Sequence, residues 1–288
     1  RDQPRSRGLG DVYKRQSMRT VAVLTVDIRV PHYARTAYTI EREFSRRGYE
    51  VILCNTGGDR AETLRYLQVV NQKQVDGIVL VGSVFDTICQ GAEMEKLLSG
   101  VPVVLANGKL DLPNAYSVTV DDKYGVSLAV EHLVARGRKN IYYIKDRDTD
   151  SAKSKRDGFL EAMRRNGLEF ADHVLEAGET LASGMETVQA LLAQGVVPDG
   201  IVCGEDLTAA GALKALLRAG LRVPGQVAVV GFNNSDYAHL CEPVLTSVDN
   251  KPEQVALLCV QLLESSIERS EAYSSVVLQP ELAQGETS

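Results

Sequence analysis

The sequence predicts an α/β protein of two lobes, each a doubly wound parallel sheet flanked by helices. Continuous apolar runs rich in β-branched residues alternate with helical patterns from residue 21 onward, which is typical of parallel strands buried on both faces. The alternation restarts near residue 141. DGIVLVG at 76–82 resembles DGIVCGE at 199–205, and VPVVLANG at 101–108 resembles VAVVGFNN at 227–234, at nearly constant offsets of 123 and 126 residues. This spacing indicates two copies of one unit of five or six strands.

The elements of the first copy follow in order. The expected strands are VAVLTVD (21–27), VILCNT (51–56), GIVLVGS (77–83) and VPVVLAN (101–107). A helix between the first two places Ala37, Ile40 and Phe44 on one face and ends at Gly48, because glycine commonly terminates helices. Further helices are expected over the stripe of Leu64, Leu67 and Val70, and over residues 91–98.

The second copy repeats the order. Its expected strands are IYYIKD (141–146), HVLEAG (173–178), GIVCGED (200–206) and VAVVGFN (227–233). Helices between them carry Phe159 and Met163, ending at Gly167, then Val188 and Leu191, then Leu207, Leu213 and Leu217. Ligands of open α/β sheets bind outside the carboxyl ends of the strands. Functional residues are therefore expected at the strand ends, where two such lobes face one cleft.

Composition fits an ordinary globular protein of 288 residues, with 44% apolar and 24% charged residues. No apolar run approaches the roughly 18 residues of a membrane span, and no apolar stretch follows the basic N-terminus as in a secretory signal. A cytoplasmic location is expected. The five cysteines are scattered without a CxxC pair, so we interpret them as reduced thiols in or near the core. No metal or other cofactor is expected.

The first residues differ from the rest. RDQPRSRGLGDVYKRQ shows no periodicity, and DVYKRQ looks like a translated sequencing adapter, so residues 1–18 are interpreted as an artefactual or disordered tail. The alternative is a genuine flexible basic tail. Residues 1–16 carry five basic and two acidic side chains, a net charge of +3, which leaves −9 on the remaining chain. A body this acidic repels phosphate backbones and should bind nucleic acid poorly by itself.

Motifs of catalysis are absent from the sequence. It contains no GxxxxGK[ST] loop, no GxGxxG after a strand and no GxSxG elbow. Carboxylates occur at strand ends, at Asp27, Asp121 and Asp206, without a recurring His or Cys beside them. A carboxylate in such a place can accept hydrogen bonds from the hydroxyls of a sugar or polyol. The sequence therefore predicts a binding protein and not an enzyme.

Several ordered segments resemble the effector domain of lac-repressor (LacI/GalR) family transcriptional regulators. They are VAVLTVDIRVPHYARTAYTIEREFSRRGYEVILCNTGGD, VDGIVLVGS, VPVVLANG, VTVDDKYGVSLAVEHLVARGRKNIYYI, SAKSKRDGFLEAM, PDGIVCGEDLTAAGALKALLRAGLRVPGQVAVVGFNN and EPVLTSVDNKPEQVALLCVQLL. The resemblance covers residues 19 to about 284. It implies the two-lobed fold of periplasmic sugar-binding proteins, with an N-terminal lobe of residues 19–119 and 251–272 and a C-terminal lobe of residues 120–250 and 273–288.

The resemblance also implies a function. Such domains bind a small, sugar-like effector and dimerise as part of a DNA-binding repressor, and a homodimer is therefore expected. Operator DNA would be contacted only through a helix-turn-helix headpiece, which precedes the domain in family members and is missing from the matching segments. The alternative is an extracytoplasmic sugar-binding protein of a transporter, which would need an export signal.

Family roles carried onto this chain give a set of ligand-binding residues at the cleft. On the N-terminal side and its crossover they are Asp27, Arg29, Tyr33, Ser83, Asn107 and Asp121. On the C-terminal side they are Lys155, Arg156, Glu205, Asp206, Asn233 and Asn250. Three positions depart from the family pattern. Lys155 stands at the arginine of RxxG, Glu205-Asp206 replace an Asn-Asp pair, and Asn233-Asn234 replace an acidic pair. These departures alter the hydrogen-bonding groups offered to the ligand.

Structural roles remain open for most of these residues. Tyr33 could be a packing residue at a helix start, and Asp206 could stabilise the N-terminus of a helix at 206–219. Asp27 and Asn233 could serve turns, and Lys155 and Arg156 could be solvated charges.

For the dimer, the helices at 60–73 and 252–267 are candidate surfaces, because they carry more apolar residues than one core-facing stripe needs, namely Leu64, Val69, Val70, Leu257 and Leu258. The alternative is that both helices are buried on two sides within the monomer.

Overall fold

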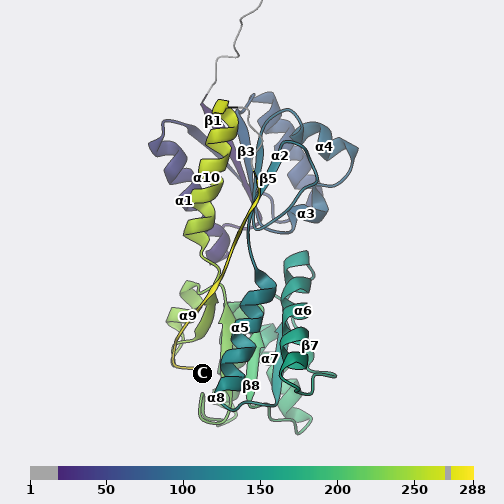
Figure 1. The fold of residues 1–288 in the computed structure, drawn as a ribbon, viewed down its shortest axis with the longest axis vertical. Coiled ribbons are helices and arrows are strands. Elements are labelled where there is room, and N and C mark those ends of the chain that lie inside the picture. Colours follow the sequence, from purple (N-terminus) through teal and green to yellow (C-terminus); the bar gives the residue numbers. More distant parts are fainter. Residues whose placement is uncertain (1–18, 270–273) are drawn as a thin grey trace, which may run out of the picture.

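The computed structural model describes residues 19–269 and 274–288 as two lobes stacked along the long axis (Figure 1). The predicted tail at residues 1–18 lies outside the described residues. Each lobe is a six-stranded sheet, ordered β11-β5-β4-β3-β1-β2 in the N-terminal lobe and β12-β10-β9-β8-β6-β7 in the C-terminal lobe. All strand pairs are parallel except β10 with β12. The prediction of two doubly wound α/β units is confirmed.

The N-terminal lobe contains most of the first half of the chain. Its strands are β1 (Thr20–Thr25), β2 (Glu50–Asn55), β3 (Gly77–Val81), β4 (Val103–Ala106), β5 (Ala115–Val120) and β11 (Val276–Leu278). Its helices are α1 (Pro31–Arg46), α2 (Arg60–Gln72), α3 (Phe85–Ile88), α4 (Ala92–Leu98) and α10 (Pro252–Arg269). Helices α1 and α10 cover one face of the sheet and α2 to α4 the other.

The C-terminal lobe repeats this plan. Its strands are β6 (Ile141–Lys145), β7 (Val174–Glu176), β8 (Gly200–Cys203), β9 (Ala228–Phe232), β10 (Thr246–Asp249) and β12 (Glu281–Ala283). Its helices are α5 (Asp122–Ala135), α6 (Asp150–Arg165), α7 (Leu181–Ala193), α8 (Asp206–Arg218) and α9 (Asp236–Leu240). Helices α5 and α6 cover one face, and α7 to α9 cover the other.

Alternation of apolar side chains along the strands builds the four core layers. In β1, Val21 and Val23 pack under α1 and α10, whereas Ala22 and Leu24 pack under α2 to α4, and all four are fully buried. Successive residues of a strand point to opposite faces, so a continuous apolar run is what a sheet covered on both sides requires. Four of the five free cysteines are buried, and Cys241 is partly exposed.

The chain crosses between the lobes three times. It leaves β5 for α5, returns from β10 to α10, and leaves β11 for β12. Strand β11 pairs with β5 at Val276 opposite Val118, so residues 276–278 belong to the N-terminal sheet. The sequence had placed 273–288 in the C-terminal lobe. The difference arises because a three-residue edge strand carries too little pattern to show which sheet it joins.

Candidate functional site

The carboxyl ends of the strands of both sheets meet at a cleft between the lobes. Its closed centre, here called the inner chamber, has a volume of about 50 Å³. It is lined by His32, Tyr33, Thr36, Val81, Gly82, Ser83, Ala106, Asn107, Asp122, Arg147, Thr149, Ser151, Lys155, Gly204, Glu205, Asn233 and Asn250. Seven of the twelve residues predicted from the sequence are in this set: Tyr33, Ser83, Asn107, Lys155, Glu205, Asn233 and Asn250.

The N-terminal lobe presents two aromatic rings to the inner chamber from the start of α1. The rings of His32 and Tyr33 lie 4.0 Å apart between centroids. Burial, followed by the charges of Arg147 and Lys155, lowers the pKa of His32 well below its ordinary value, so this imidazole is neutral. The hydroxyl of Tyr33 accepts a hydrogen bond of 3.2 Å from Arg147 Nη1 of the other lobe. Tyr33 therefore joins the two lobes in addition to packing in the core.

Gly82 has a φ of +126°, and a Cβ there would come within 2.8 Å of Val26 and 3.0 Å of the Tyr33 ring. Only glycine lets β3 end so close to that ring.

The C-terminal lobe presents a chain of polar side chains from the ends of β8, β9 and β10. Asn250 Nδ2 donates to Asn233 Oδ1 at 2.8 Å, and Asn233 Nδ2 lies 3.4 Å from Glu205 Oε1. The other carboxylate oxygen of Glu205 accepts the backbone N–H of Leu207 at 2.6 Å, which caps α8. Burial raises the pKa of Glu205 to about 7, and the negative charges of Asp206 and Asp146 add to this. Asn233 has a positive φ of 100°, so its backbone also shapes the turn after β9.

Two cations lie at the inner chamber, and other groups already engage both. Lys155 Nζ donates to the carbonyl of Gly204 at 3.0 Å and lies 3.8 Å from the centroid of the Phe232 ring. Arg147 pairs with Asp146 at 3.1 Å and with Glu179 at 3.4 Å. The sequence reasoning missed Arg147 because its signal is only a position two residues beyond β6, next to an aspartate.

The remaining predicted residues lie elsewhere. Asp27 pairs with Arg29 at 2.8 Å, and the side chain of Arg29 is 87% exposed. Hydrogen bonds from Arg29 lower the pKa of Asp27. Arg156 pairs with its neighbour Asp157 at 2.7 Å on an exposed face of α6. These three predicted side chains do not line the inner chamber, and each pairs with an opposite charge one or two residues away in the sequence.

Asp206 is fully buried inside the C-terminal lobe and does not reach the inner chamber. Its Oδ2 accepts from the backbone N–H of Ser235 at 2.7 Å and from the hydroxyl of Ser235 at 2.8 Å, and its Oδ1 accepts from the hydroxyl of Ser247 at 2.6 Å. Burial nonetheless raises its pKa to about 6. These contacts join the start of α8 to the turn after β9 and to β10, so they favour the structural role left open by the sequence.

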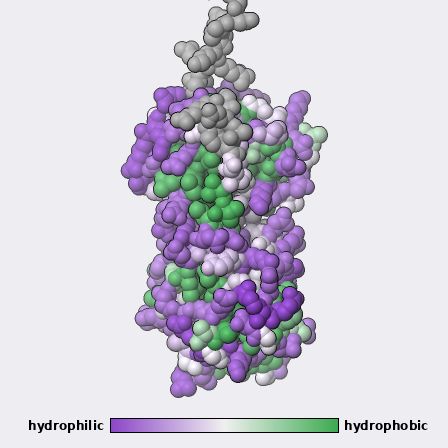
Figure 2. All heavy atoms as spheres, viewed as in Figure 1, coloured by the Kyte–Doolittle hydropathy of each residue, from purple (hydrophilic) through white to green (hydrophobic). Residues whose placement is uncertain are grey.

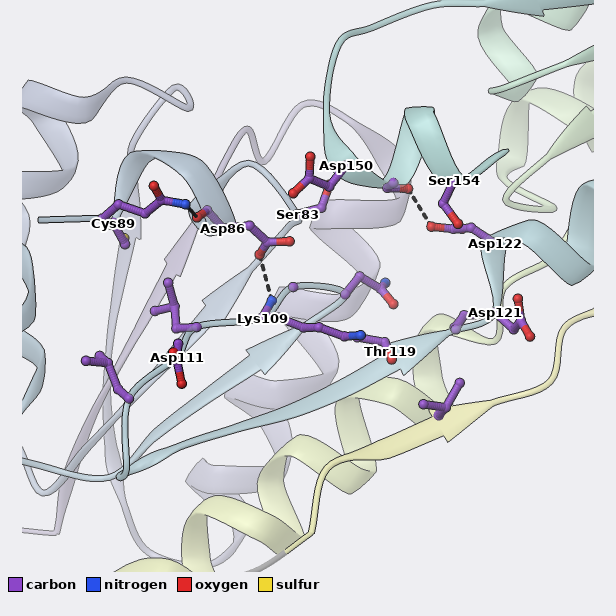
Figure 3. A pocket seen from close by; sticks show the side chains of 18 of the residues that line it. Ser83, Asp86, Cys89, Lys109, Asp111, Thr119, Asp121, Asp122, Asp150 and Ser154 are labelled. Atoms are coloured by element: carbon purple, nitrogen blue, oxygen red, sulfur yellow. Dashed lines mark hydrogen bonds between the residues drawn. The ribbon is translucent and has the colours of Figure 1, made fainter. Parts of the chain in front are cut away.

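A larger hollow of about 750 Å³, here called the outer vestibule, adjoins the inner chamber. The two cavities share Ser83, Asn107, Asp122 and Ser151 as lining residues. Figure 3 shows the vestibule between the loops of the N-terminal lobe and the starts of α5 and α6, with Asp86, Asp121, Asp122 and Asp150 around it. The predicted residue Asp121 lines this cavity and caps α5 through the N–H of Tyr124.

Burial is the main cause of the raised pKa values of two carboxyl groups in the vestibule. It raises the pKa of Asp86 to about 6, although the carboxylate accepts the backbone N–H of Lys109 at 2.7 Å. Burial also raises the pKa of Asp122, whose Oδ2 accepts from Ser151 at 2.6 Å. Within residues 19–269 and 274–288, no group of three His, Cys, Asp or Glu side chains could hold a metal ion. The chemistry offered is hydrogen bonding and charge.

The fold and the cleft define a ligand-binding domain of the periplasmic-binding-protein type. Residues 130–288 match the family described as "Periplasmic binding protein-like domain". The chain is 31% identical over 261 residues to an HTH-type transcriptional regulator of Lachnoclostridium phytofermentans, covering 90% of this chain and 77% of that protein. A LacI transcriptional regulator from a Rhodococcus species has a similar structure, with a TM-score of 0.80, 28% identity and coverage of 93% and 97% of the two chains. The complex of the transcriptional regulator CelR with cellobiose has a TM-score of 0.81, with 25% identity and coverage of 94% and 85%.

The chain belongs to the LacI/GalR family of transcriptional regulators, of which it forms the effector-binding domain. The resemblance seen in the sequence is thereby confirmed. The relatives are regulators of transcription, which favours this function over a transporter's binding protein.

Proposed function

We propose that this domain binds a small polyhydroxy effector, a sugar or related polyol, between its lobes and performs no catalysis. The observation that carries the proposal is the convergence of Ser83 and Asn107 from one lobe with Glu205, Asn233 and Asn250 from the other on one chamber. Hydroxyls and amides of this kind fix the orientation of a ligand while surrounding apolar groups bury it. The CelR complex, which holds cellobiose, supports a sugar.

Binding must be accompanied by movement of the lobes. The inner chamber, at about 50 Å³, has room for one or two water molecules, each occupying about 30 Å³ in the liquid. For a sugar ring to fill the inner chamber itself, the lobes would have to separate and the contact between Tyr33 and Arg147 would break. Three crossing segments form the hinge for such a motion, and closure around the ligand would follow.

A thermal-shift screen of sugars, nucleosides and polyols tests the proposal. A true effector should stabilise the protein by about 2.7 kcal/mol at a hundredfold excess over its Kd. An Asn107→Ala variant should lose most of this shift, whereas Asn166→Ala, at the end of α6 and outside the cleft, should keep it. Stabilisation only by phosphorylated or multiply anionic compounds would contradict a neutral or cationic polyhydroxy ligand.

We further propose that the domain acts in the cytoplasm as a homodimer formed chiefly by the N-terminal lobe. Dimerisation would let effector binding alter the spacing of two attached DNA-reading headpieces, through which operator DNA is contacted. Strand β2 is an edge strand, and exposed apolar side chains surround it, namely Leu53 (46% exposed), Tyr38 of α1 (60%) and Val69 of α2 (37%). Unpaired edges and apolar surface of this kind favour association.

Helix α10 is the second candidate surface. Figure 2 shows an apolar area over it in the N-terminal lobe, where Leu257 is 39% exposed. Light scattering at tens of micromolar should give a dimer that Leu53→Lys dissociates and Leu257→Lys does not. A monomeric parent protein would refute the dimer, and the opposite response of the two variants would move the interface to α10. No helix within the described parts of the chain is long and apolar enough to cross a membrane.

A further inference from the structure

Two hydrogen-bond acceptors on the C-terminal wall of the inner chamber, Asn250 Oδ1 and Glu205 Oε1, lack a close donor among the described residues. The side-chain amide nitrogens of Asn250 and Asn233 both contact groups of the protein. Asn250 Nδ2 donates to Asn233 Oδ1, and Asn233 Nδ2 lies between Glu205 and His32. Asn250 Oδ1 has no hydrogen-bond partner among the residues that the structure describes, although the side chain is more than nine-tenths buried. A buried acceptor without a donor costs free energy, so this atom is matched only when a ligand donates to it.

Glu205 adds a second acceptor that is not fully matched. Its Oε1 has only the amide of Asn233, at the long distance of 3.4 Å, and the residue is 6% exposed. Neither nearby cation forms a direct ion pair with it: Lys155 Nζ donates to Gly204, and Arg147 bonds with Asp146, Glu179 and Tyr33. The charge of Arg147 acts on Glu205 only from a distance, lowering its pKa less than burial raises it, and a buried carboxylate without a directly bonded counter-ion is disfavoured.

The vestibule extends this imbalance of charge. Its lining holds six carboxylates, Asp86, Glu95, Asp111, Asp121, Asp122 and Asp150, and one cation, Lys109. Because the vestibule and the inner chamber share four lining residues, a ligand that enters from the vestibule passes this excess of carboxylates before it reaches the chamber, where Arg147 and Lys155 lie beside Asp122 and Glu205. Such a potential attracts cations and repels phosphates and carboxylates.

We propose that the effector is an amine-bearing polyhydroxy compound, such as an amino sugar, whose protonated amine binds Glu205 Oε1 and Asn250 Oδ1. An ammonium offers three N–H donors and no acceptor, which fits a wall of acceptors better than a hydroxyl does. The hydroxyls of the same ligand pair with Ser83 and Asn107 on the opposite lobe. This inference rests on the proposed function, because it takes the cleft as the effector site.

Matched ligands distinguish the contribution of the amine to the affinity from that of the sugar ring. Calorimetric titration at pH 7.5 would compare glucosamine with glucose and with N-acetylglucosamine, and galactosamine with galactose and N-acetylgalactosamine. Each set keeps the ring and changes the substituent at C2, which is an ammonium, a hydroxyl or a neutral acetamide; the comparison with the hydroxyl keeps the size nearly constant, and the acetamide keeps the nitrogen without its charge. We expect the better amino sugar to bind at least tenfold more tightly than its neutral counterparts, the size of effect that a charge-assisted hydrogen bond gives.

Two variants assign the preference to Glu205. Glu205→Gln keeps the shape and the acceptor for Leu207 but removes the charge, and it should abolish the tenfold preference of the amino sugar over its neutral counterparts. Glu186→Gln, exposed on α7 outside both cavities, should preserve the preference. Equal or tighter binding of the neutral sugars by the parent protein overturns the inference and leaves the proposed function standing. If no compound of either set binds, the inference is overturned, and the proposed function is decided separately by the wider screen of sugars, nucleosides and polyols. A preference that survives Glu205→Gln overturns the role of Glu205.

Discussion

Replacing the carboxyl of Glu205 by an amide should change how the stability of the protein depends on pH. The pKa of Glu205 is about 7 in the folded state, against an ordinary value of 4.5, mainly because the group is buried. Between these values the folded state binds more protons than the unfolded state, so the free energy of unfolding falls as pH rises. A difference of about 2.5 pKa units corresponds to about 3 kcal/mol lost by pH 8.

The Glu205→Gln variant has no carboxyl to titrate at this position, so its free energy of unfolding should not show this decrease as the pH rises. The amide keeps an oxygen for the N–H of Leu207, though a neutral acceptor is weaker than a charged one by about 1 kcal/mol. We therefore expect the variant to be about 2 kcal/mol more stable than the parent at pH 8. At pH 5 the Glu205 carboxyl of the folded parent is mostly protonated. There the variant should be as stable as the parent or slightly less stable.

Urea unfolding followed by far-ultraviolet circular dichroism at pH 5 and pH 8 measures both differences. The chain has no tryptophan, so fluorescence is the weaker probe. The parent and the variant share Asp206, whose raised pKa of about 6 gives a trend of the same sign. Because the charges of Asp206 and Glu205 interact, the difference between the two profiles measures the Glu205 carboxyl together with its coupling to Asp206. A stability difference that is the same at both pH values would refute the reasoning, because it would mean that the Glu205 carboxyl does not titrate between them.

Two further substitutions test the packing beneath the cleft. Asp206→Ala should lower the free energy of unfolding by about 3 kcal/mol or more, because it leaves the N–H and hydroxyl of Ser235 and the hydroxyl of Ser247 without their acceptor. Chemical denaturation measures this loss, and a large drop in effector affinity with little loss of stability would instead return Asp206 to the ligand site. Gly211→Ala should destabilise by about 3 kcal/mol, because its Cβ would lie 2.2 Å from a backbone oxygen of α7. Gly100→Ala, with open space around its Cβ position, is the control, and equal melting temperatures for the two variants would contradict this account of the α7–α8 contact.

The sequence was sufficient for most of the fold. Runs such as VAVLTVD and GIVLVGS are buried on both faces, and this burial leaves a continuous apolar pattern. Strand β5, AYSVTV, mixes polar and apolar residues and was not predicted, and neither were the three-residue strands β11 and β12. The two short edge strands pair with strands more than 30 residues away in the chain, and no local sequence pattern reveals such pairing.

The candidate site was predicted only in part. The resemblance to the family found Ser83, Asn107, Glu205, Asn233 and Asn250, all of which follow strands, where topology places the ligand-binding residues of open sheets. Residues that reach the cavity from helix starts or from the far side of the lobe contact, such as His32, Asp122, Arg147 and Ser151, were missed. Their position depends on how the two lobes meet. A sequence pattern also does not show which ion pairs form between charged side chains, as the pair of Asp27 and Arg29 illustrates.

The two short strands near the C-terminus have a consequence for how this protein is made. Strand β11 completes the edge of the first sheet and β12 the edge of the second, and Thr287 is fully buried with its hydroxyl on the carbonyl of Val229. Domains of a growing chain usually fold in order as they leave the ribosome. Here neither sheet is complete before residues 276–283 have emerged, so both lobes reach their final form together, only after these residues have left the ribosome. A nascent chain stalled before that point would expose the open edges of two sheets at once, which makes it a substrate for chaperones.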